Sequence, residues 1–217
     1  MTEFDGYLFD LDGTLLNTID LIVACIRHTL AGIADIKIPE ENIRKNIGIP
    51  LKNQYMIYLT HLDGIDYNKV VEDHLHYQSQ IWKEYVRMYE GIPEMLKVLD
   101  DNGKKMAIVT SRRLDAAEIY LDEMNIRKYF PVIITPAATE KHKPDAEPAL
   151  CAADMIKIKP GKCIMIGDSV FDIMCGKNAR MKTCFAQWGA LGGKIEDVMS
   201  DYVVKNPGEI LSIEGLS

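Results

Sequence analysis

A chain of 217 residues is long enough for one sizeable domain, or for a domain with a smaller insert. Its net charge of −7 argues against a general nucleic-acid-binding surface, which needs an excess of Lys and Arg. No window approaches the roughly 18 apolar residues of a membrane helix, and the N-terminus lacks the features of a secretory signal. The five cysteines form no Cys-x-x-Cys pair, so we expect reduced, mostly buried thiols. We therefore expect a cytoplasmic protein, monomeric or homodimeric, with no nucleic-acid or membrane partner.

The first apolar run predicts a buried strand that ends in two carboxylates. Tyr7, Leu8 and Phe9 precede Asp10, and Asp12 follows two residues later. Residues two apart in an extended backbone project to the same side, so both carboxylates face one small volume. Their repulsion is costly unless a cation or a shared proton compensates it. Read alone, the same residues also fit a strand followed by a solvated Asp-Gly turn.

The next part of the chain, to about residue 90, has helical patterning. Apolar residues recur at helical spacing from 19 to 33, and helices are also expected near 39–47, over 51–62 and over 67–88. Pro39 and the acidic residues after it suit a first helical turn. No second strand is predicted in this part of the chain.

From Gly91 onward the pattern alternates between helices and short apolar strands. The predicted strands cover residues 106–109, 132–134, 163–166, 183–185 and 202–204. Such alternation favours a parallel sheet that is covered by helices on both faces. The sequence therefore predicts an α/β fold, a Rossmann-like parallel sheet core of residues 1–15 and 91–217. An all-helical domain of residues 16–90 is inserted into it.

Four segments together resemble the motifs of the haloacid dehalogenase superfamily. They are Phe9-Asp10-Leu11-Asp12-Gly13-Thr14-Leu15, Val109-Thr110-Ser111, Lys143-Pro144 and Gly167-Asp168-Ser169-Val170-Phe171-Asp172. Their order matches the family, and the resemblance covers nearly the whole chain. The position of the helical insert resembles the subgroup with phosphoglycolate phosphatase and β-phosphoglucomutase. That resemblance implies a helical cap over the active site.

The resemblance also implies roles for individual residues. Asp10 is the expected nucleophile, which forms an aspartyl-phosphate, and Asp12 is the expected general acid and base. Thr110 and the backbone amide of Ser111 are expected to hold the transferring phosphoryl group. Lys143 is expected to neutralise the phosphoryl oxygens. Read alone, Thr110 and Ser111 also suit an ordinary helix cap.

A magnesium site follows from the same resemblance. Asp168 is the expected ligand, together with the Asp10 carboxylate and the backbone carbonyl of Asp12. Asp172 is expected either to ligate the metal through water or to orient Lys143. The family often has a second proline after the lysine motif, but Ala146 occupies that position here.

The candidate substrate-binding residues outside these motifs are cations. Arg112 follows the second motif, and Arg44, Lys45 and Lys52 flank the cap loop of residues 48–50. In the resembled subgroup this loop often contacts the substrate, so these side chains are candidates for binding the leaving group. They also fit solvated positions at a helix start and on a basic helix face.

The sequence predicts a Mg²⁺-dependent phosphatase of a small phosphorylated metabolite, similar to phosphoglycolate phosphatase. A pyrophosphatase of the same subgroup is an alternative, because Asn17 stands where many phosphoglycolate phosphatases carry an aspartate. A phosphomutase similar to β-phosphoglucomutase is a second alternative. A non-catalytic binding protein is disfavoured, because it would not need both Asp10 and Asp12.

Overall fold

The computed structural model describes residues 4–33, 36–189, 199–213 and 215–216. None of the helices in these ranges is long and apolar enough to cross a membrane. The elements, in chain order, are β1 (Gly6–Phe9), β2 (Leu16–Asn17), α1 (Ile19–Ile33), α2 (Glu40–Lys45), α3 (Leu51–Tyr58), α4 (Tyr67–Tyr85), β3 (Arg87–Met88), α5 (Ile92–Asp101), β4 (Lys105–Val109), α6 (Leu114–Glu123), η1 (Arg127–Tyr129), β5 (Val132–Ile134), α7 (Glu147–Met155), η2 (Pro160–Lys162), β6 (Cys163–Gly167), α8 (Val170–Asn178), β7 (Lys182–Ala186), β8 (Tyr202–Val204) and α9 (Gly208–Ile213).

The predicted parallel sheet is confirmed. Six strands follow the order β5-β4-β1-β6-β7-β8, and every neighbouring pair is parallel. Strand β1 lies inside the sheet, where Phe9 is in register with Ile108 of β4 and with Ile166 of β6. The end of β1 therefore meets the ends of two other strands.

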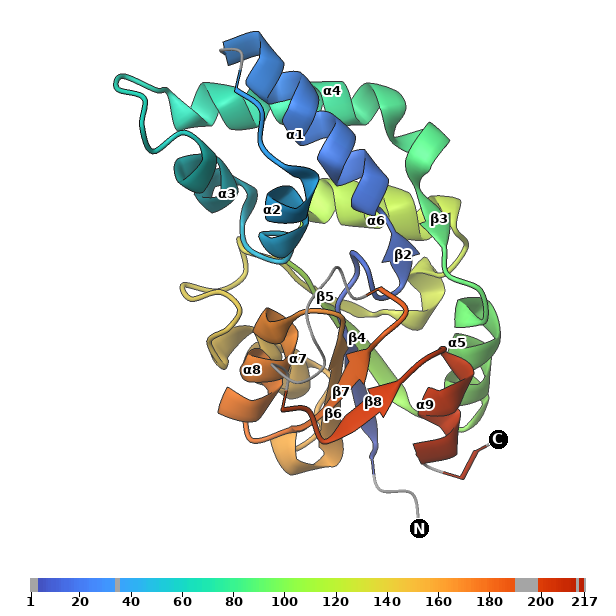
Figure 1. The fold of residues 1–217 in the computed structure, drawn as a ribbon. Coiled ribbons are helices and arrows are strands. Elements are labelled where there is room, and N and C mark those ends of the chain that lie inside the picture. The colour runs from blue at the N-terminus through green and yellow to red at the C-terminus, as the bar shows by residue number, and fades with distance from the viewer. Residues whose placement is uncertain (1–3, 34–35, 190–198, 214, 217) are drawn as a thin grey trace.

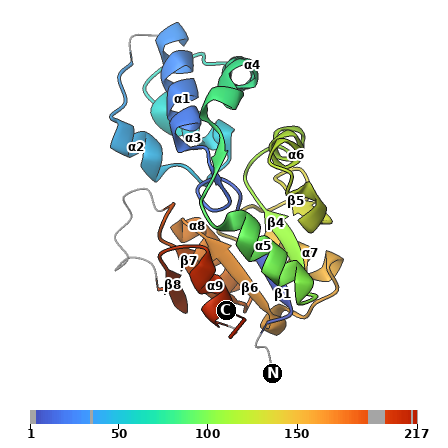
Figure 2. The same ribbon diagram turned by 90° about the vertical axis from the view of Figure 1, so that its right-hand side faces the viewer.

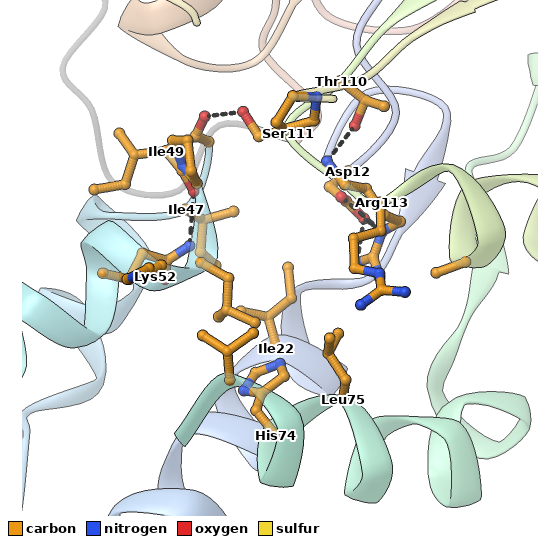
Figure 3. A pocket seen from close by; sticks show the side chains of 18 of the residues that line it. Asp12, Ile22, Ile47, Ile49, Lys52, His74, Leu75, Thr110, Ser111 and Arg113 are labelled. Carbon is orange, nitrogen blue, oxygen red and sulfur yellow. Dashed lines mark hydrogen bonds and ion pairs between the residues drawn. The ribbon is translucent and has the colours of Figure 1, made fainter. Parts of the chain in front are cut away.

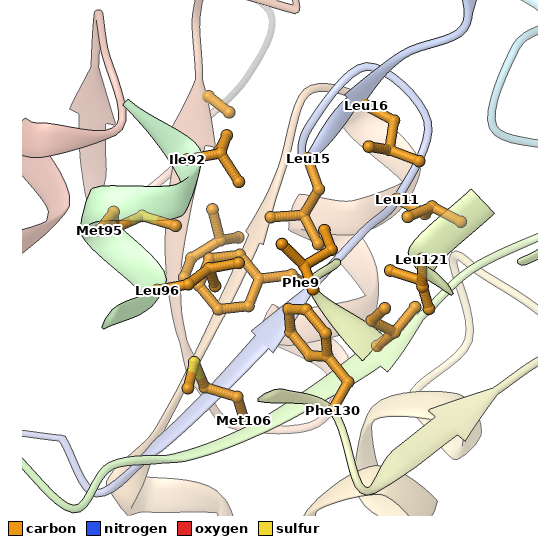
Figure 4. Close-up of a cluster of buried hydrophobic side chains, with 14 of the residues drawn as sticks. Phe9, Leu11, Leu15, Leu16, Ile92, Met95, Leu96, Met106, Leu121 and Phe130 are labelled. Atoms are coloured by element: carbon orange, nitrogen blue, oxygen red, sulfur yellow. The ribbon is translucent and has the colours of Figure 1, made fainter. Parts of the chain in front are cut away.

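Helices cover both faces of the sheet (Figure 2). Because side chains of a strand alternate, Phe9 packs with the cluster on one face and Leu8 with the cluster on the other. The first cluster joins Phe9, Leu15 and Phe130 to residues of α5, among them Leu96 (Figure 4). The second lies beneath α7 and α8, and four of the five cysteines are buried in these two clusters. Burial on both faces explains why the strands read as continuous apolar runs.

The helical insert has a core of its own. Helices α1 to α4 lie together beyond the carboxyl end of the sheet (Figure 1). Apolar side chains of α1, including Ile26, pack with Tyr55 of α3 and Val70 of α4. Asp66 caps α4 by accepting hydrogen bonds from the backbone amides of the first turn. The helical pattern of the sequence therefore reflects burial within this small cluster.

Two short strands correct the prediction that residues 11–90 contain no strand. In β2 and β3, Leu16 pairs with Met88 and Asn17 with Arg87, in antiparallel orientation. Two residues are too few to show the alternation by which a strand is recognised. Because Arg87 and Met88 are in β3, α4 ends at Tyr85 and not at residue 88.

Both chain connections between the insert and the sheet run through β2 and β3. We therefore propose that residues 16–90 act as a cap and that residues 1–15 and 91–217 form the core.

Candidate active site

The motifs meet at the carboxyl edge of the sheet. Asp10 follows β1, Thr110 follows β4 and Asp168 follows β6, and these three strands are neighbours. The backbone continues the ladder there, because the amide of Asp10 donates to the carbonyl of Ile166 at 2.9 Å. This is the edge where open α/β sheets bind ligands.

A buried cluster of carboxylates surrounds one lysine. Oxygens of Asp10, Asp168 and Asp172 lie within 4.8 Å of one another. The Nζ of Lys143 donates to Asp10 Oδ1 at 2.7 Å, to Asp172 Oδ1 at 2.6 Å and to the carbonyl of Val109 at 3.1 Å. Three carboxyl groups thus share the charge of one ammonium group.

Burial governs the protonation of this cluster. The pKa of Asp10 is raised to about 7, because desolvation and the charges of Asp172 and Asp12 together outweigh the opposing effect of Lys143. Desolvation, followed by the charge of Asp10, also raises the pKa of Asp168 well above its usual value. Burial alone would lower the pKa of Lys143, but Asp10 and Asp172 hold it above its ordinary value. The cluster has more carboxylates than ammonium groups, and carboxylate oxygens are the hard ligands that Mg²⁺ prefers. The residues present therefore fit a divalent cation such as Mg²⁺.

Both carboxylate oxygens of Asp172 accept hydrogen bonds. Its Oδ1 binds Lys143, and its Oδ2 accepts from the amide of Ser169 at 3.1 Å and from Ser169 Oγ at 2.5 Å. Ser169 Oγ also accepts a hydrogen bond from the backbone amide of Asp172. Together these contacts form the capping box at the start of α8. Of the two roles expected for Asp172, the geometry supports the orientation of Lys143.

The loop after β1 fits closely against Asp168. Gly13 has φ +85°, and a Cβ there would lie 2.2 Å from Asp168 Oδ2, so only glycine is compatible. The hydroxyl of the fully buried Thr14 donates to Asp168 Oδ1 at 3.2 Å. Trp188 Nε1 donates to the carbonyl of Thr14 at 2.9 Å and fixes the loop from the other side. The sequence alone assigned no role to Thr14 or Trp188, since both act through partners more than 150 residues away.

The second motif contacts the cap directly. Thr110 Oγ1 accepts from the amide of Arg112 at 3.1 Å, and Ser111 Oγ donates to the carbonyl of Gly48 at 2.6 Å. Gly48 has φ +107° and lies against Ser169 and Phe171 of the core. The cap loop is therefore seated on the predicted phosphoryl-binding residues.

A pocket of about 230 Å³ lies between the cap and these residues (Figure 3). Asp12, Thr110 and Ser111 lie on its core side, whereas His74 and Leu75 face it from α4. Much of the remaining cap lining is apolar, formed by Ile22, Ile47, Ile49, Leu51 and Val71. The predicted catalytic residues therefore face a small chamber whose cap side is largely apolar.

The predicted substrate-binding cations divide into two groups. Lys52 and Arg112 line the pocket, although Lys52 donates to Asn68 Oδ1 and Arg112 is bound to Asp12. Arg44 instead pairs with Glu40 and Asp20 on the cap, and Lys45 is exposed outside the pocket. The structure thus does not bring Arg44 or Lys45 to the pocket, since neither lines it and Arg44 is held by its two acidic partners.

The chain matches one family model and several named relatives over most of its length. A model of the haloacid dehalogenase-like hydrolase family matches residues 7–186. A Clostridium perfringens protein named "Putative pyrophosphatase PpaX" is 39% identical over 210 residues, covering 95% of either chain. The "Pyrophosphatase PpaX" of Halalkalibacterium halodurans is 31% identical over 215 residues, covering 99% of this chain and 98% of its own.

A solved structure shows the same fold. The crystal structure of a "predicted phosphoglycolate phosphatase" from Haemophilus somnus matches with a TM-score of 0.88 at 20% identity, covering 98% of this chain and 99% of that chain. At that identity the likeness concerns the fold alone. Together with the family match and the relatives above 30% identity, it leads to one conclusion. The chain belongs to the haloacid dehalogenase-like hydrolase family.

Proposed function

We propose that the protein is a Mg²⁺-dependent phosphatase that hydrolyses a small phosphorylated metabolite through an aspartyl-phosphate. The observation that carries this proposal is the position of Asp10. It is buried at a strand end, bound to Lys143 and within the lining of the pocket that also contains Asp12. An oriented carboxylate beside a second acid is the arrangement needed for displacement at phosphorus with proton transfer.

The first step forms the phosphoryl-enzyme. An oxygen of Asp10 attacks phosphorus while Lys143 holds the carboxylate, and Asp12 gives a proton to the leaving oxygen. Thr110 and the amide of Ser111 hold the oxygens of the transferring group. In the second step Asp12 takes a proton from water, which then attacks the phosphorus and releases Asp10.

The carboxylate cluster supplies the proposed metal ligands. Asp10, Asp168 and the backbone carbonyl of Asp12 would hold Mg²⁺, which when bound offsets the negative charge of the phosphoryl oxygens. Thr14 keeps Asp168 in place, and Asp172 keeps Lys143 in place. The cytoplasm is the proposed location.

The leaving group is proposed to be organic. Ile22, Ile47 and Ile49 form much of the cap side of the pocket, where an organic group is buried at less cost than a charged phosphate, and the lining cations Lys52 and Arg112 already have partners. Pyrophosphate is the second candidate, because the two relatives described above are named pyrophosphatases.

Phosphate release from a panel of phosphoglycolate, sugar phosphates, nucleotides and pyrophosphate tests the proposal. We expect turnover that requires Mg²⁺ and that Asp10→Asn abolishes, whereas the exposed Asp5→Asn retains it. Activity that persists in Asp10→Asn would contradict the nucleophile assignment. Two phosphates per turnover would identify the pyrophosphatase, and isomer formation without phosphate release would identify a mutase.

A further inference from the structure

Asp12, the proposed acid–base residue, is bound by Arg112, which directly follows the second motif. Arg112 Nη2 donates to Asp12 Oδ1 at 2.7 Å, and Arg112 Nε donates to Oδ1 at 3.0 Å and Oδ2 at 2.9 Å. The hydroxyl of Thr18 donates to Oδ1 at 2.6 Å. The Arg112 side chain is only 7% exposed, so it is far more constrained than a surface arginine.

Arg112 is itself held by a tyrosine of α6. Its guanidinium lies over the ring of Tyr120, 4.8 Å from the centroid, and Nη1 approaches the Tyr120 hydroxyl at 3.5 Å. The ring of Tyr120 stacks on Trp82 of α4 at 4.8 Å. Ring and hydroxyl thus constrain Arg112 from two directions.

A buried glutamine of the cap completes the connection. Gln78 Nε2 donates to the Tyr120 hydroxyl at 3.1 Å. Gln78 Oε1 lies 3.3 Å from His74 Nε2, and His74 Nδ1 lies 2.7 Å from the hydroxyl of Tyr55. Because the Gln78 amide nitrogen donates to Tyr120, the atom that faces His74 is the amide oxygen, which accepts a hydrogen bond from His74 Nε2. His74 Nδ1 then carries no proton and accepts a hydrogen bond from the Tyr55 hydroxyl. The contacts with His74 and Tyr55 therefore fix the orientation of the Gln78 amide from within the cap.

We propose that Arg112 is a positioning residue for Asp12, and that Gln78 and Tyr120 couple its position to the cap. The inference rests on the proposed phosphatase function and deepens it. Gln78 belongs to α4 and Tyr120 to α6, so the acid–base carboxyl is oriented by the cap as well as by the sheet. Seating of the cap then sets the geometry of proton transfer.

The contacts also assign the two oxygens of Asp12. Oδ1 accepts hydrogen bonds from the Thr18 hydroxyl and from Nε and Nη2 of Arg112. Oδ2 accepts a hydrogen bond from Arg112 Nε alone. Oδ2 is therefore the oxygen that exchanges protons. As the bond from phosphorus to the leaving oxygen breaks, the electron pair stays on that oxygen, which takes the proton from Asp12 Oδ2. The new bond joins Asp10 to phosphorus.

Aryl and benzyl phosphates provide the test, because they differ in how much the leaving oxygen needs a proton. 4-Nitrophenyl phosphate releases a weak base, phenyl phosphate a stronger base and benzyl phosphate the strongest. Arg112→Lys keeps the positive charge but loses the several hydrogen bonds that the guanidinium group donates to Asp12. We expect this variant to lower kcat/KM about 100-fold for benzyl phosphate and less than about 3-fold for 4-nitrophenyl phosphate. Arg113→Lys, the neighbouring pocket arginine that pairs with Asp115, is the matched control and should show no such gradient.

Tyr120→Phe tests the coupling with little risk to folding, since it keeps the ring stack and removes only the hydroxyl. We expect about a 5-fold loss of kcat/KM on benzyl phosphate for Tyr120→Phe and for Gln78→Leu. The double variant should lose about 5-fold and not about 25-fold, because both changes break one connection.

The outcomes separate the two hypotheses. Equal losses on all three esters in Arg112→Lys, or fully additive losses in the double variant, would overturn the positioning role. A folded wild-type protein that is inactive on every ester and on the panel above would instead contradict the phosphatase function itself.

Discussion

Lys143 shows how one side chain sets the charge state of the site. Its ammonium group lies between two buried carboxylates, 2.7 Å from Asp10 and 2.6 Å from Asp172. Removing it leaves both without their cation, and breaking one partner from a buried ion pair costs about 3–5 kcal/mol.

We expect Lys143→Met to abolish phosphate release and to lower the free energy of unfolding by about 3 kcal/mol in urea titrations. The exposed Lys141→Met, two residues away, should change neither quantity measurably. A stable and active Lys143→Met protein would show that Asp10 does not depend on this cation.

His74 predicts a pH dependence of stability. Desolvation lowers its pKa from 6.5 to about 4; the hydrogen bond with Gln78 opposes this shift, and the charge of Arg112 adds to it. Between pH 6.5 and about pH 4 the unfolded chain therefore binds a proton that the folded chain does not. The free energy of unfolding should decrease as the pH falls through this range, by an amount of the order of 3 kcal/mol from this residue.

Urea unfolding at several pH values, for the wild type and for His74→Gln, isolates the contribution of His74. The buried carboxylates titrate in both proteins, so their effects cancel in the difference. Identical pH profiles for the two proteins would mean that His74 is not held neutral.

The residues that the sequence could predict were those within contiguous motifs. The motif match pointed to Asp10, Asp12, Lys143 and Asp168, and the structure brings them together at one sheet edge. The partner of Asp12 could not be read in the same way, because Arg112 is 100 residues away and its neighbourhood fits a solvated helix start equally well.

At the scale of elements, the cap loop is the part of the insert that contacts the second motif, through Gly48 and Ser111. Gly48 has φ +107°, and a Cβ there would lie 3.2 Å from Phe171 and 3.3 Å from Ser169 Oγ. Gly64 has φ +72° but open space around it, so Gly64→Ala carries a similar backbone strain without the clash.

We expect Gly48→Ala to raise KM about 5-fold or more, because the loop can no longer seat on Ser111 and the core. Gly64→Ala should lower stability by about 1 kcal/mol and leave KM unchanged. Steady-state kinetics with unfolding curves checks both. Equal KM values in the two variants would show that loop seating does not contribute to substrate binding.

Elements were predictable where the pattern was long. The strands of the parallel sheet and helices such as α1 carry several apolar residues at regular spacing, and they were found close to the expected positions. Strands β2 and β3 have two residues each and are defined by pairing across 70 residues of chain, which leaves no local signal.

For the molecule as a whole, the proposed metal site joins two central strands. Asp10 follows β1 and Asp168 follows β6, so a cation bound to both would stabilise the folded state over the unfolded chain. We expect Mg²⁺ at about 100 times its Kd to stabilise the protein by roughly 2.7 kcal/mol in thermal unfolding.

Asp168→Asn should remove this stabilisation, and Asp5→Asn should retain it. An equal increase in Tm for all three proteins would place the cation elsewhere. Chelation should reverse the increase in the wild type.

The central position of β1 has a consequence for how the chain folds during synthesis. Gly6–Phe9 is made first, yet its neighbours in the sheet are Lys105–Val109 and Cys163–Gly167. The helical insert between them has an apolar cluster formed wholly by its own residues, from Ile19 to Val71. We therefore expect nascent chains that end near residue 103 to contain a protease-resistant cap and an unpaired β1. Chains that reach residue 189 should protect both. Asp10, the proposed nucleophile, would then be the first of the proposed catalytic residues to be made and among the last to reach its folded position.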